Sequence, residues 1–198
     1  MVEPERYIEI FLQPGELYFG GRDTRIRTLL GSCVSLVIWH PQLHVGGMCH
    51  FMLPGRARSP QTLLDGRYAD EAMELLLVDI RKIGAPPSEY RLKMFGGGNM
   101  FPGITRADAS HIGSKNVQTA RELSERYGFT CVSEHVEGSG HRYLIFDVWS
   151  GIVSLRHSAL RVSVEPAAML APMDFTGSAE ADALSARFPV AMTSSRLK

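Results

Sequence analysis

The sequence lacks any apolar run near the roughly 20 residues that a membrane-spanning helix needs. Its first segment, MVEPERYIEIFLQPGE, contains acidic residues and no uninterrupted apolar stretch, so it does not resemble a signal peptide. The formal net charge is +0, and without a basic excess the chain has little to hold a phosphate backbone. We therefore expect no membrane insertion and no nucleic-acid partner.

Cysteine is scarce, since the 198 residues include only Cys33, Cys49 and Cys131. An odd, low number suggests free thiols in a reducing cytoplasm. The hydrophobic content of 44% and charged content of 21% are ordinary for a globular protein, and no internal repeat is visible. We expect one cytoplasmic domain over residues 1–157 and a loosely structured extension over 158–198, with a short helix near 179–188.

Hydrophobic periodicity predicts seven or eight strands and two helices. The strand segments are residues 7–12, 17–19, 34–39, 45–53, 92–95, 129–136, 142–148 and 152–156. The helices are residues 67–83 and 114–127, each followed by a glycine, and residues 54–66 are a loop. Because strands and helices do not alternate strictly, the pattern favours an α+β fold with mixed or antiparallel sheets.

The residues with the clearest chemical meaning lie in the run TLLGSCVSLVIWHPQLHVGGMCHFMLP. A hairpin centred on the Pro41–Gln42 bond would place Cys33 directly opposite His50. Proline cannot adopt the positive φ of a primed two-residue turn, so we expect a four-residue loop around a type I turn. The Gly46–Gly47 pair indicates either a bulge, which would shift this register by one residue, or a close backbone approach.

A thiol beside an imidazole is the minimal apparatus of a cysteine hydrolase, because the imidazole takes the thiol proton and later protonates the leaving group. Gly31 and Ser32 precede Cys33 and place it at a strand entrance, where a histidine would favour the thiolate. The plainer interpretation is that both residues are structural. Free cysteines are usually inert core residues, and a histidine in an apolar strand is usually a core or edge residue whose ring nitrogens are hydrogen-bonded. Cys49 is expected in the core, on the opposite face of its strand from His50.

Two other interpretations of this region are weaker. Four potential zinc ligands lie close together in the sequence: Cys33, His44, Cys49 and His50. Their spacing does not match the usual pairs of zinc ligands, so we expect no metal. Gly96–Gly98 follows a strand without a P-loop or dinucleotide-binding pattern, so no nucleotide cofactor is expected. Such a loop could instead donate amide N–H groups to an oxyanion or position a substrate side chain.

Several short blocks resemble, in their order along the chain, the CheD family of bacterial chemotaxis proteins, the chemoreceptor glutamine deamidases. The blocks are Leu30–Val34 (LGSCV), Gly46–Pro54 (GGMCHFMLP), Tyr68–Ala72 (YADEA), Phe95–Phe101 (FGGGNMF), Ile112–Asn116 (IGSKN), Phe146–Asp147 (FD) and Ser150–Val153 (SGIV). The resemblance extends over about residues 7–157, and the blocks are specific together although each alone is weak.

The resemblance implies cysteine-dependent hydrolysis of a glutamine side-chain amide, without a cofactor. Carried onto this sequence, Cys33 is the nucleophile and His50 the base. Thr28 is the nearest match to a threonine that the family uses shortly before the cysteine. The candidates for contacting the substrate or the oxyanion are Ser32, Gly31, Gly97 and Gly98.

The implied fold is like that of the cytotoxic necrotizing factor deamidases, a layered sandwich of two mixed β-sheets with helices on one side. The implied partners are methyl-accepting chemotaxis receptors and, where the organism has one, a CheC-type phosphatase of phosphorylated CheY. Two features depart from the family: Cys49 stands where alanine is more usual, and residues 137–142 are a looser version of its glycine and Gly-Arg pattern.

Two alternatives stay open. The protein could be mainly a binding module that docks on receptors or on a CheC-type phosphatase, with vestigial catalysis. In that case Cys33→Ala would keep full biological activity. It could also be a general cysteine hydrolase of small amides, which would turn over free glutamine.

Overall fold

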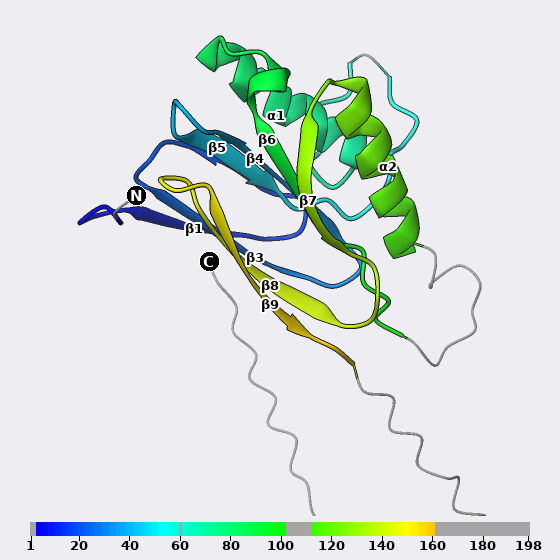
Figure 1. The fold of residues 1–198 in the computed structure, drawn as a ribbon. Coiled ribbons are helices and arrows are strands. Elements are labelled where there is room, and N and C mark those ends of the chain that lie inside the picture. Colours follow the sequence, from blue (N-terminus) through cyan, green and yellow to red (C-terminus); the bar gives the residue numbers. More distant parts are fainter. Residues whose placement is uncertain (1–2, 60, 102–111, 161–198) are drawn as a thin grey trace, which may run out of the picture. The chain divides into compact units, whose positions relative to one another are not determined.

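The computed structural model describes residues 3–59, 61–101 and 112–160 (Figure 1). The strands in these ranges are β1 (Ile8–Leu12), β2 (Leu17–Gly20), β3 (Thr24–Leu30), β4 (Val34–His40), β5 (Val45–Cys49), β6 (Arg91–Gly96), β7 (Thr130–Val136), β8 (His141–Asp147) and β9 (Ile152–Ser158). The helices are α1 (Ala69–Ile83), α2 (Ile112–Arg126) and a short 3-10 helix, Pro87–Glu89. The helix predicted near residues 179–188 lies outside the described residues.

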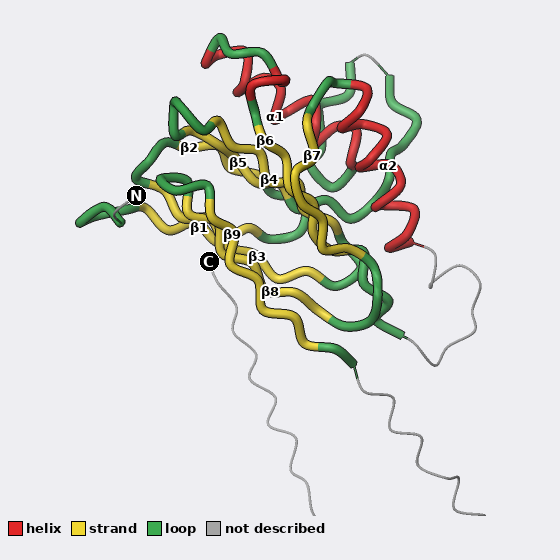
Figure 2. Tube along the Cα trace, viewed as in Figure 1, coloured by secondary structure: helices red, strands yellow, loops and turns green. Residues whose placement is uncertain are grey.

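The strands form two mixed sheets (Figure 2). The four-stranded sheet has the order β1-β3-β8-β9, with β1 and β3 parallel and the other pairs antiparallel. The five-stranded sheet has the order β2-β5-β4-β6-β7, with only β6 and β7 parallel. The predicted α+β class with two mixed sheets is confirmed.

The two helices cover one face of the five-stranded sheet, and the four-stranded sheet lies against its other face (Figure 1). Along β4, Leu36 and Ile38 join the core beneath the helices, whereas Val37 joins the core between the sheets. A strand buried on both faces has no polar side. The mostly apolar sequence of β4, which only Ser35 and the final His40 interrupt, therefore follows from its central position.

Helix α1 is close to its predicted range and ends where the sequence indicates. Gly84 takes a left-handed φ of 83°, and its N–H donates to the carbonyl of Ile80. Acidic residues in the first turn and basic residues in the last complement the helix dipole. Within the described ranges, no helix has the length and apolar character needed to cross a membrane.

The loop between β4 and β5 has the expected four residues, 41–44, but its centre lies one residue later than predicted. His40 pairs with Val45, and the N–H of His44 donates to the carbonyl of His40 at 3.0 Å. The shifted loop closes because His44 adopts a left-handed φ of 51°. Histidine is among the residues that populate this region more often than most.

The register of the hairpin is consequently displaced by two residues. Val34 and Phe51 form a bridge with two reciprocal N–H to carbonyl hydrogen bonds of 3.0 Å. Cys33 is therefore a diagonal neighbour of His50, and the prediction that the two lie directly opposite is wrong. Diagonal neighbours share a face of the sheet and stay within reach of long side chains.

The Gly46–Gly47 pair allows a close backbone approach and does not form a bulge, since its pairing with β4 is uninterrupted. A Cβ on Gly46 would lie 2.4 Å from the carbonyl oxygen of Ile38. A Cβ on Gly47 would lie 2.8 Å from a ring carbon of Phe19. The glycines thus let β5 fit between its two neighbouring strands.

Strand β3 is the element that the periodicity did not predict. It pairs with both β1 and β8 in the four-stranded sheet. Its buried positions are Thr24, Ile26, Thr28 and Leu30, alternating with more exposed side chains. Because two of these four inward residues are threonines, the strand does not show the usual apolar alternation.

Candidate active site

Three strands of two different sheets position the residues of the predicted site. Thr28 belongs to β3, Cys33 directly precedes β4, and His50 directly follows β5. The Cys33 side chain packs against the core between the sheets. His50 contacts Thr28 of the facing sheet. The side chains of Cys33 and His50 therefore project from the same face of the five-stranded sheet.

Thr28 and His50 form a buried hydrogen bond of 2.7 Å between Oγ1 and Nδ1. The threonine hydroxyl also lies 2.9 Å from the carbonyl oxygen of Leu12, which can only accept. The single hydroxyl proton must therefore go to Leu12, and the hydroxyl oxygen accepts from His50. This pattern assigns the imidazole proton to Nδ1 and leaves the lone pair on Nε2.

The Nε2 atom of His50 is buried and has no hydrogen-bond partner among the described residues. Only 2% of His50 is exposed. Burial lowers the pKa of His50 to about 4, against the raising effects of the Leu12 carbonyl and the charge of Glu16. His50 is therefore neutral near pH 7, with a free basic nitrogen in the core between the sheets.

Cys33 is half-buried, and burial raises the pKa of its thiol despite the favourable effect of its own backbone N–H. Apart from its own backbone N–H, the thiol has no hydrogen-bond partner among the described residues, and His50 Nε2 is without one there as well. The resting state that follows is a neutral thiol and a neutral imidazole on one face of the sheet, not a preformed ion pair.

The glycine loop after β6 supports the segment that carries Cys33. Gly97 N–H donates to the Cys33 carbonyl at 2.8 Å, and Gly98 N–H donates to the Gly31 carbonyl at 2.9 Å. Gly97 has a positive φ of 66°, and a Cβ there would lie 2.4 Å from Val117 of α2. Both amides are occupied in this arrangement, so the loop holds the Cys33 segment and is not free to bind an oxyanion.

The amides next to the thiol are in a different situation. Within the described ranges, neither Ser32 N–H nor Cys33 N–H donates to a backbone carbonyl. Amide N–H groups beside the nucleophile are well placed to bind the oxyanion of a tetrahedral intermediate. Ser32 and Cys33 are thus better candidates for the oxyanion site than Gly97 and Gly98.

Asn116 of α2 is a site residue that the sequence reasoning did not single out. Its Nδ2 donates to the Met52 carbonyl at 2.8 Å and to the Ser32 carbonyl at 3.2 Å. One fully buried amide thus joins the segment before Cys33 to the segment after His50. The available signal was a polar residue on the inward face of an amphipathic helix, next to Val117 and Ala120.

Cys49 lies on the opposite face of its strand, as expected from strand alternation. It is fully buried in the core beneath the helices, and burial raises the pKa of its thiol to about 12. Among the described residues, no three His, Cys, Asp or Glu side chains are grouped so that they could hold a metal ion.

Comparison with known proteins identifies relatives of the chain. A family model described as CheD, chemotactic sensory transduction, matches residues 52–157. The probable chemoreceptor glutamine deamidase CheD of Pseudomonas fluorescens (strain SBW25) is 46% identical, over 84% of this chain and 94% of that protein. The probable chemoreceptor glutamine deamidase CheD 3 of Dechloromonas aromatica (strain RCB) is 50% identical, over 77% and 89% respectively. Among solved structures, the hypothetical protein YfiH of Bacillus licheniformis covers 58% of this chain and 46% of its own, with 15% identity and a TM-score of 0.34, which is too low to bear on the fold.

Proposed function

The chain belongs to the CheD family, and on that premise we propose that it hydrolyses the side-chain amide of glutamine residues in methyl-accepting chemoreceptors, releasing ammonia and leaving glutamate. The names of its relatives, chemoreceptor glutamine deamidases, support this substrate. Within the chain, the observation that carries the proposal is the hydrogen bond from His50 to Thr28, which leaves Nε2 unprotonated.

In the proposed first step, Nε2 of His50 takes the thiol proton while Sγ of Cys33 attacks the carboxamide carbon. A carbon–sulfur bond forms, and the carbonyl oxygen becomes an oxyanion. Nε2 then returns its proton to the amide nitrogen as the carbon–nitrogen bond breaks. Ammonia leaves, and the glutamine side chain is bound to Cys33 as a thioester.

The second step is hydrolysis of the thioester. His50 takes a proton from the attacking water, and a second tetrahedral oxyanion forms. The carbon–sulfur bond breaks, the thiol regains its proton through His50, and the product is a glutamate side chain. The amides of Ser32 and Cys33 are proposed to bind the oxyanion in both steps.

The proposed proton transfers depend on a neutral imidazole, and burial of His50 supports one. With a pKa of about 4, His50 is unprotonated at the start of the cycle. Thr28 holds the ring through Nδ1, so Nε2 is the nitrogen that takes and returns the proton in every step. A fixed tautomer and ring orientation are what a histidine base requires from its third partner.

Several finer features belong to the same proposal. The two mixed sheets with helices on one side are the arrangement expected for a fold like that of the cytotoxic necrotizing factor deamidases. We place the protein in the cytoplasm, where chemoreceptor glutamines and a reduced Cys33 thiol would meet. A CheC-type phosphatase as a second partner stays a prediction, as does the domain boundary near residue 157.

The decisive experiment incubates the full chain with cytoplasmic fragments of several receptors from its own organism. Mass spectrometry of the digested receptor then reads the conversion of glutamine to glutamate. The wild-type protein should convert specific glutamines, and Cys33→Ala should convert none. Cys131→Ser is the matched control, because Cys131 is an exposed free cysteine and should be dispensable.

Three results would contradict the proposal. Identical null traces from the wild-type protein and Cys33→Ala across the receptors would remove the enzymatic claim. Full activity of Cys33→Ala in a chemotaxis assay would favour a binding module instead. Rapid hydrolysis of free glutamine would indicate a general amidase.

A further inference from the structure

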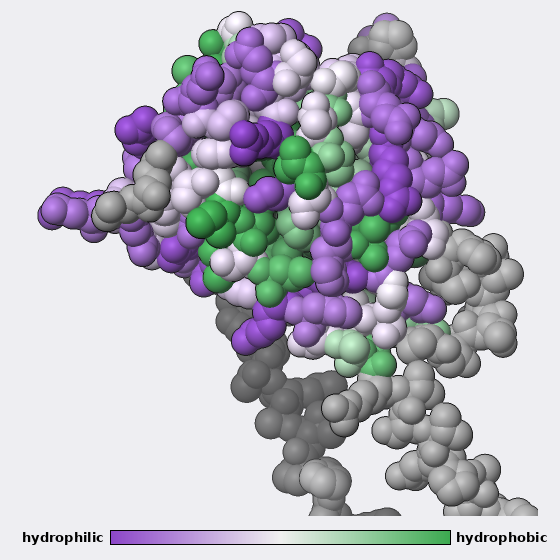
Figure 3. Space-filling view, viewed as in Figure 1, coloured by the Kyte–Doolittle hydropathy of each residue, from purple (hydrophilic) through white to green (hydrophobic). Residues whose placement is uncertain are grey.

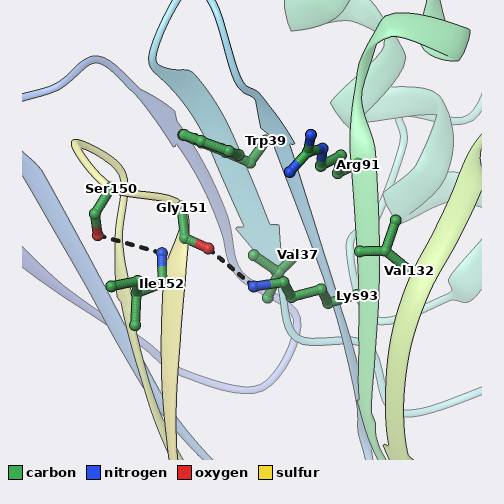
Figure 4. Close-up of a pocket in the computed structure, with 8 residues that line it drawn as sticks. All are labelled: Val37, Trp39, Arg91, Lys93, Val132, Ser150, Gly151 and Ile152. Atoms are coloured by element: carbon green, nitrogen blue, oxygen red, sulfur yellow. Dashed lines mark hydrogen bonds between the residues drawn. The ribbon is translucent and has the colours of Figure 1, made fainter. Parts of the chain in front are cut away.

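A cavity of about 300 Å³ lies between the two sheets, near the end of β4 that is distant in sequence from Cys33. Strands β4, β6 and β7 form one wall, and the turn between β8 and β9 forms the other (Figure 4). None of the residues assigned above to the active site lines it. Its volume is at the lower limit of the range for small-molecule sites.

Two cationic side chains from the same strand line this cavity, the exposed Arg91 and the partly buried Lys93. Arg91 and Lys93 are two residues apart on β6, so they project from the same face. Figure 4 shows Lys93 extending from β6 to Gly151 in the β8–β9 turn, and Arg91 extending toward Trp39. In the part of the chain that the structure describes, neither forms an ion pair with a carboxylate. The carboxylate at the start of the turn, Asp147, is paired with Arg25 at 2.6 Å.

Lys93 is held in place but keeps donors free. Its Nζ donates to the carbonyl of Gly151 at 2.9 Å, across the space between the sheets. An ammonium group has three N–H donors, so two remain available. Burial lowers the pKa of Lys93, and the charge of Arg91 lowers it further. A bound anion would oppose both effects.

Apart from Ser150, the other side chains that line the cavity are apolar, and the Trp39 ring is held in place. The Trp39 indole N–H donates to the Val148 carbonyl at 2.7 Å, which fixes the ring. Gly151 has a φ of 71°, and a Cβ there would lie 2.4 Å from the Trp39 ring, so only glycine lets the turn close over it. Ile152 and Val132 are 58% and 47% exposed beside the cavity. On the face of the molecule drawn in Figure 3, patches of apolar surface are bordered by hydrophilic surface.

We propose that this cavity binds a small organic carboxylate, whose charged end pairs with Arg91 and Lys93 and whose apolar body lies against Trp39. The guanidinium fork can donate two parallel hydrogen bonds to a carboxylate, and the Lys93 ammonium, already held in place, adds a second charged donor. An inorganic anion would use the two cations but leave the apolar wall without a partner. The inference does not depend on the proposed deamidase activity.

The test is a nuclear magnetic resonance titration of the ¹⁵N-labelled full chain with phenylacetate and, separately, butyrate. The chain has two tryptophans, so Trp149→Phe assigns the indole N–H of Trp39. We expect a saturable shift of the Trp39 indole and of the Gly151 amide. Phenylacetamide, which has the same shape without the charge, and inorganic phosphate, which has charge without the apolar body, should each bind at least about tenfold more weakly.

Variants then test the two cations. Arg91→Gln and Lys93→Gln should each weaken phenylacetate binding by about tenfold. Arg126→Gln removes an exposed cation from the end of α2 and should change nothing. Absence of a saturable shift with both carboxylates would overturn the proposal. So would equal binding of phenylacetamide or phosphate, or unchanged binding by both cation variants.

Discussion

Thr28 and His50 lie on different sheets, and a hydrogen bond of 2.7 Å from Nδ1 of His50 to Oγ1 of Thr28 joins them. The direction of this bond is determined by a third group, because the Leu12 carbonyl takes the only hydroxyl proton. A threonine in the core thus selects the histidine tautomer that the proposed chemistry needs.

Removing the Thr28 hydroxyl should therefore impair catalysis more than folding. Thr28→Val keeps the shape of the side chain but lets the imidazole change tautomer or turn. We expect kcat for receptor deamidation to fall on the order of 10²-fold, the size of a typical general-base contribution. Thr28→Ser keeps the hydroxyl and should retain most activity, and equal activity of the two variants would remove the role assigned to Thr28.

The pH dependence of Cys33 reactivity follows from a raised thiol pKa and a depressed imidazole pKa. Alkylation of Cys33 by iodoacetamide, read by mass spectrometry at each cysteine, should rise through the alkaline range without a plateau near neutral pH. Deamidation should lose its base only as the pH falls toward about 4, where His50 is protonated. A reactivity plateau near pH 6 would instead indicate a preformed thiolate–imidazolium pair.

Burial of His50 should also make the stability of the protein depend on pH. Its pKa falls from 6.5 to about 4 on folding, so between these values the unfolded chain binds more protons than the native chain. Stability is therefore unaffected above this window and decreases as the pH falls through it, by about 2 kcal/mol at a pH of about 5. Urea denaturation should show a weaker decrease for His50→Gln than for wild type, and parallel curves would contradict the assignment.

Asn116 is expected to control the spacing between the Cys33 and His50 segments. Asn116→Ala leaves the carbonyls of Ser32 and Met52 without their shared donor and should cost roughly 1–3 kcal/mol of stability. We expect kcat to fall by about tenfold or more with a smaller change in KM, since the chemistry and not receptor docking depends on this spacing.

A matched control is available on the same helix. Ser124 is also buried, and its hydroxyl donates to the Ala120 carbonyl at 2.7 Å. Ser124→Ala should lower the urea midpoint modestly and leave kcat unchanged. If both variants lose activity in proportion to stability, Asn116 is only a structural residue.

Much of the fold can be predicted from local sequence pattern. The predicted hairpin register is wrong, and yet the predicted pairing of Cys33 with His50 on one face is still correct. The loop centre was misplaced by one residue, which moved the pairing by two. Because side chains alternate with a period of two, this displacement kept Cys33 and His50 on one face, whereas a displacement of one would have separated them. The alternation also placed Cys49 correctly in the other core.

Other features could not be predicted from local pattern. Strand β3 carries two threonines on its buried face, and its partners β1 and β8 are selected by contacts distant in sequence. Thr28 was therefore found by family resemblance and not by periodicity. Gly97 and Gly98 looked like oxyanion donors because only the structure reveals that their N–H groups are already bonded.

Because the site is divided between two sheets, the thickness of the core between them affects catalysis directly. Among the described strands, none of one sheet pairs with a strand of the other, so the distance from Thr28 to His50 is set by the side chains between the sheets, Met48 and Phe146 among others. Misplacement by about 1 Å can cost an enzyme 10²-fold in rate. Substitutions in this layer can therefore abolish activity while the protein stays folded.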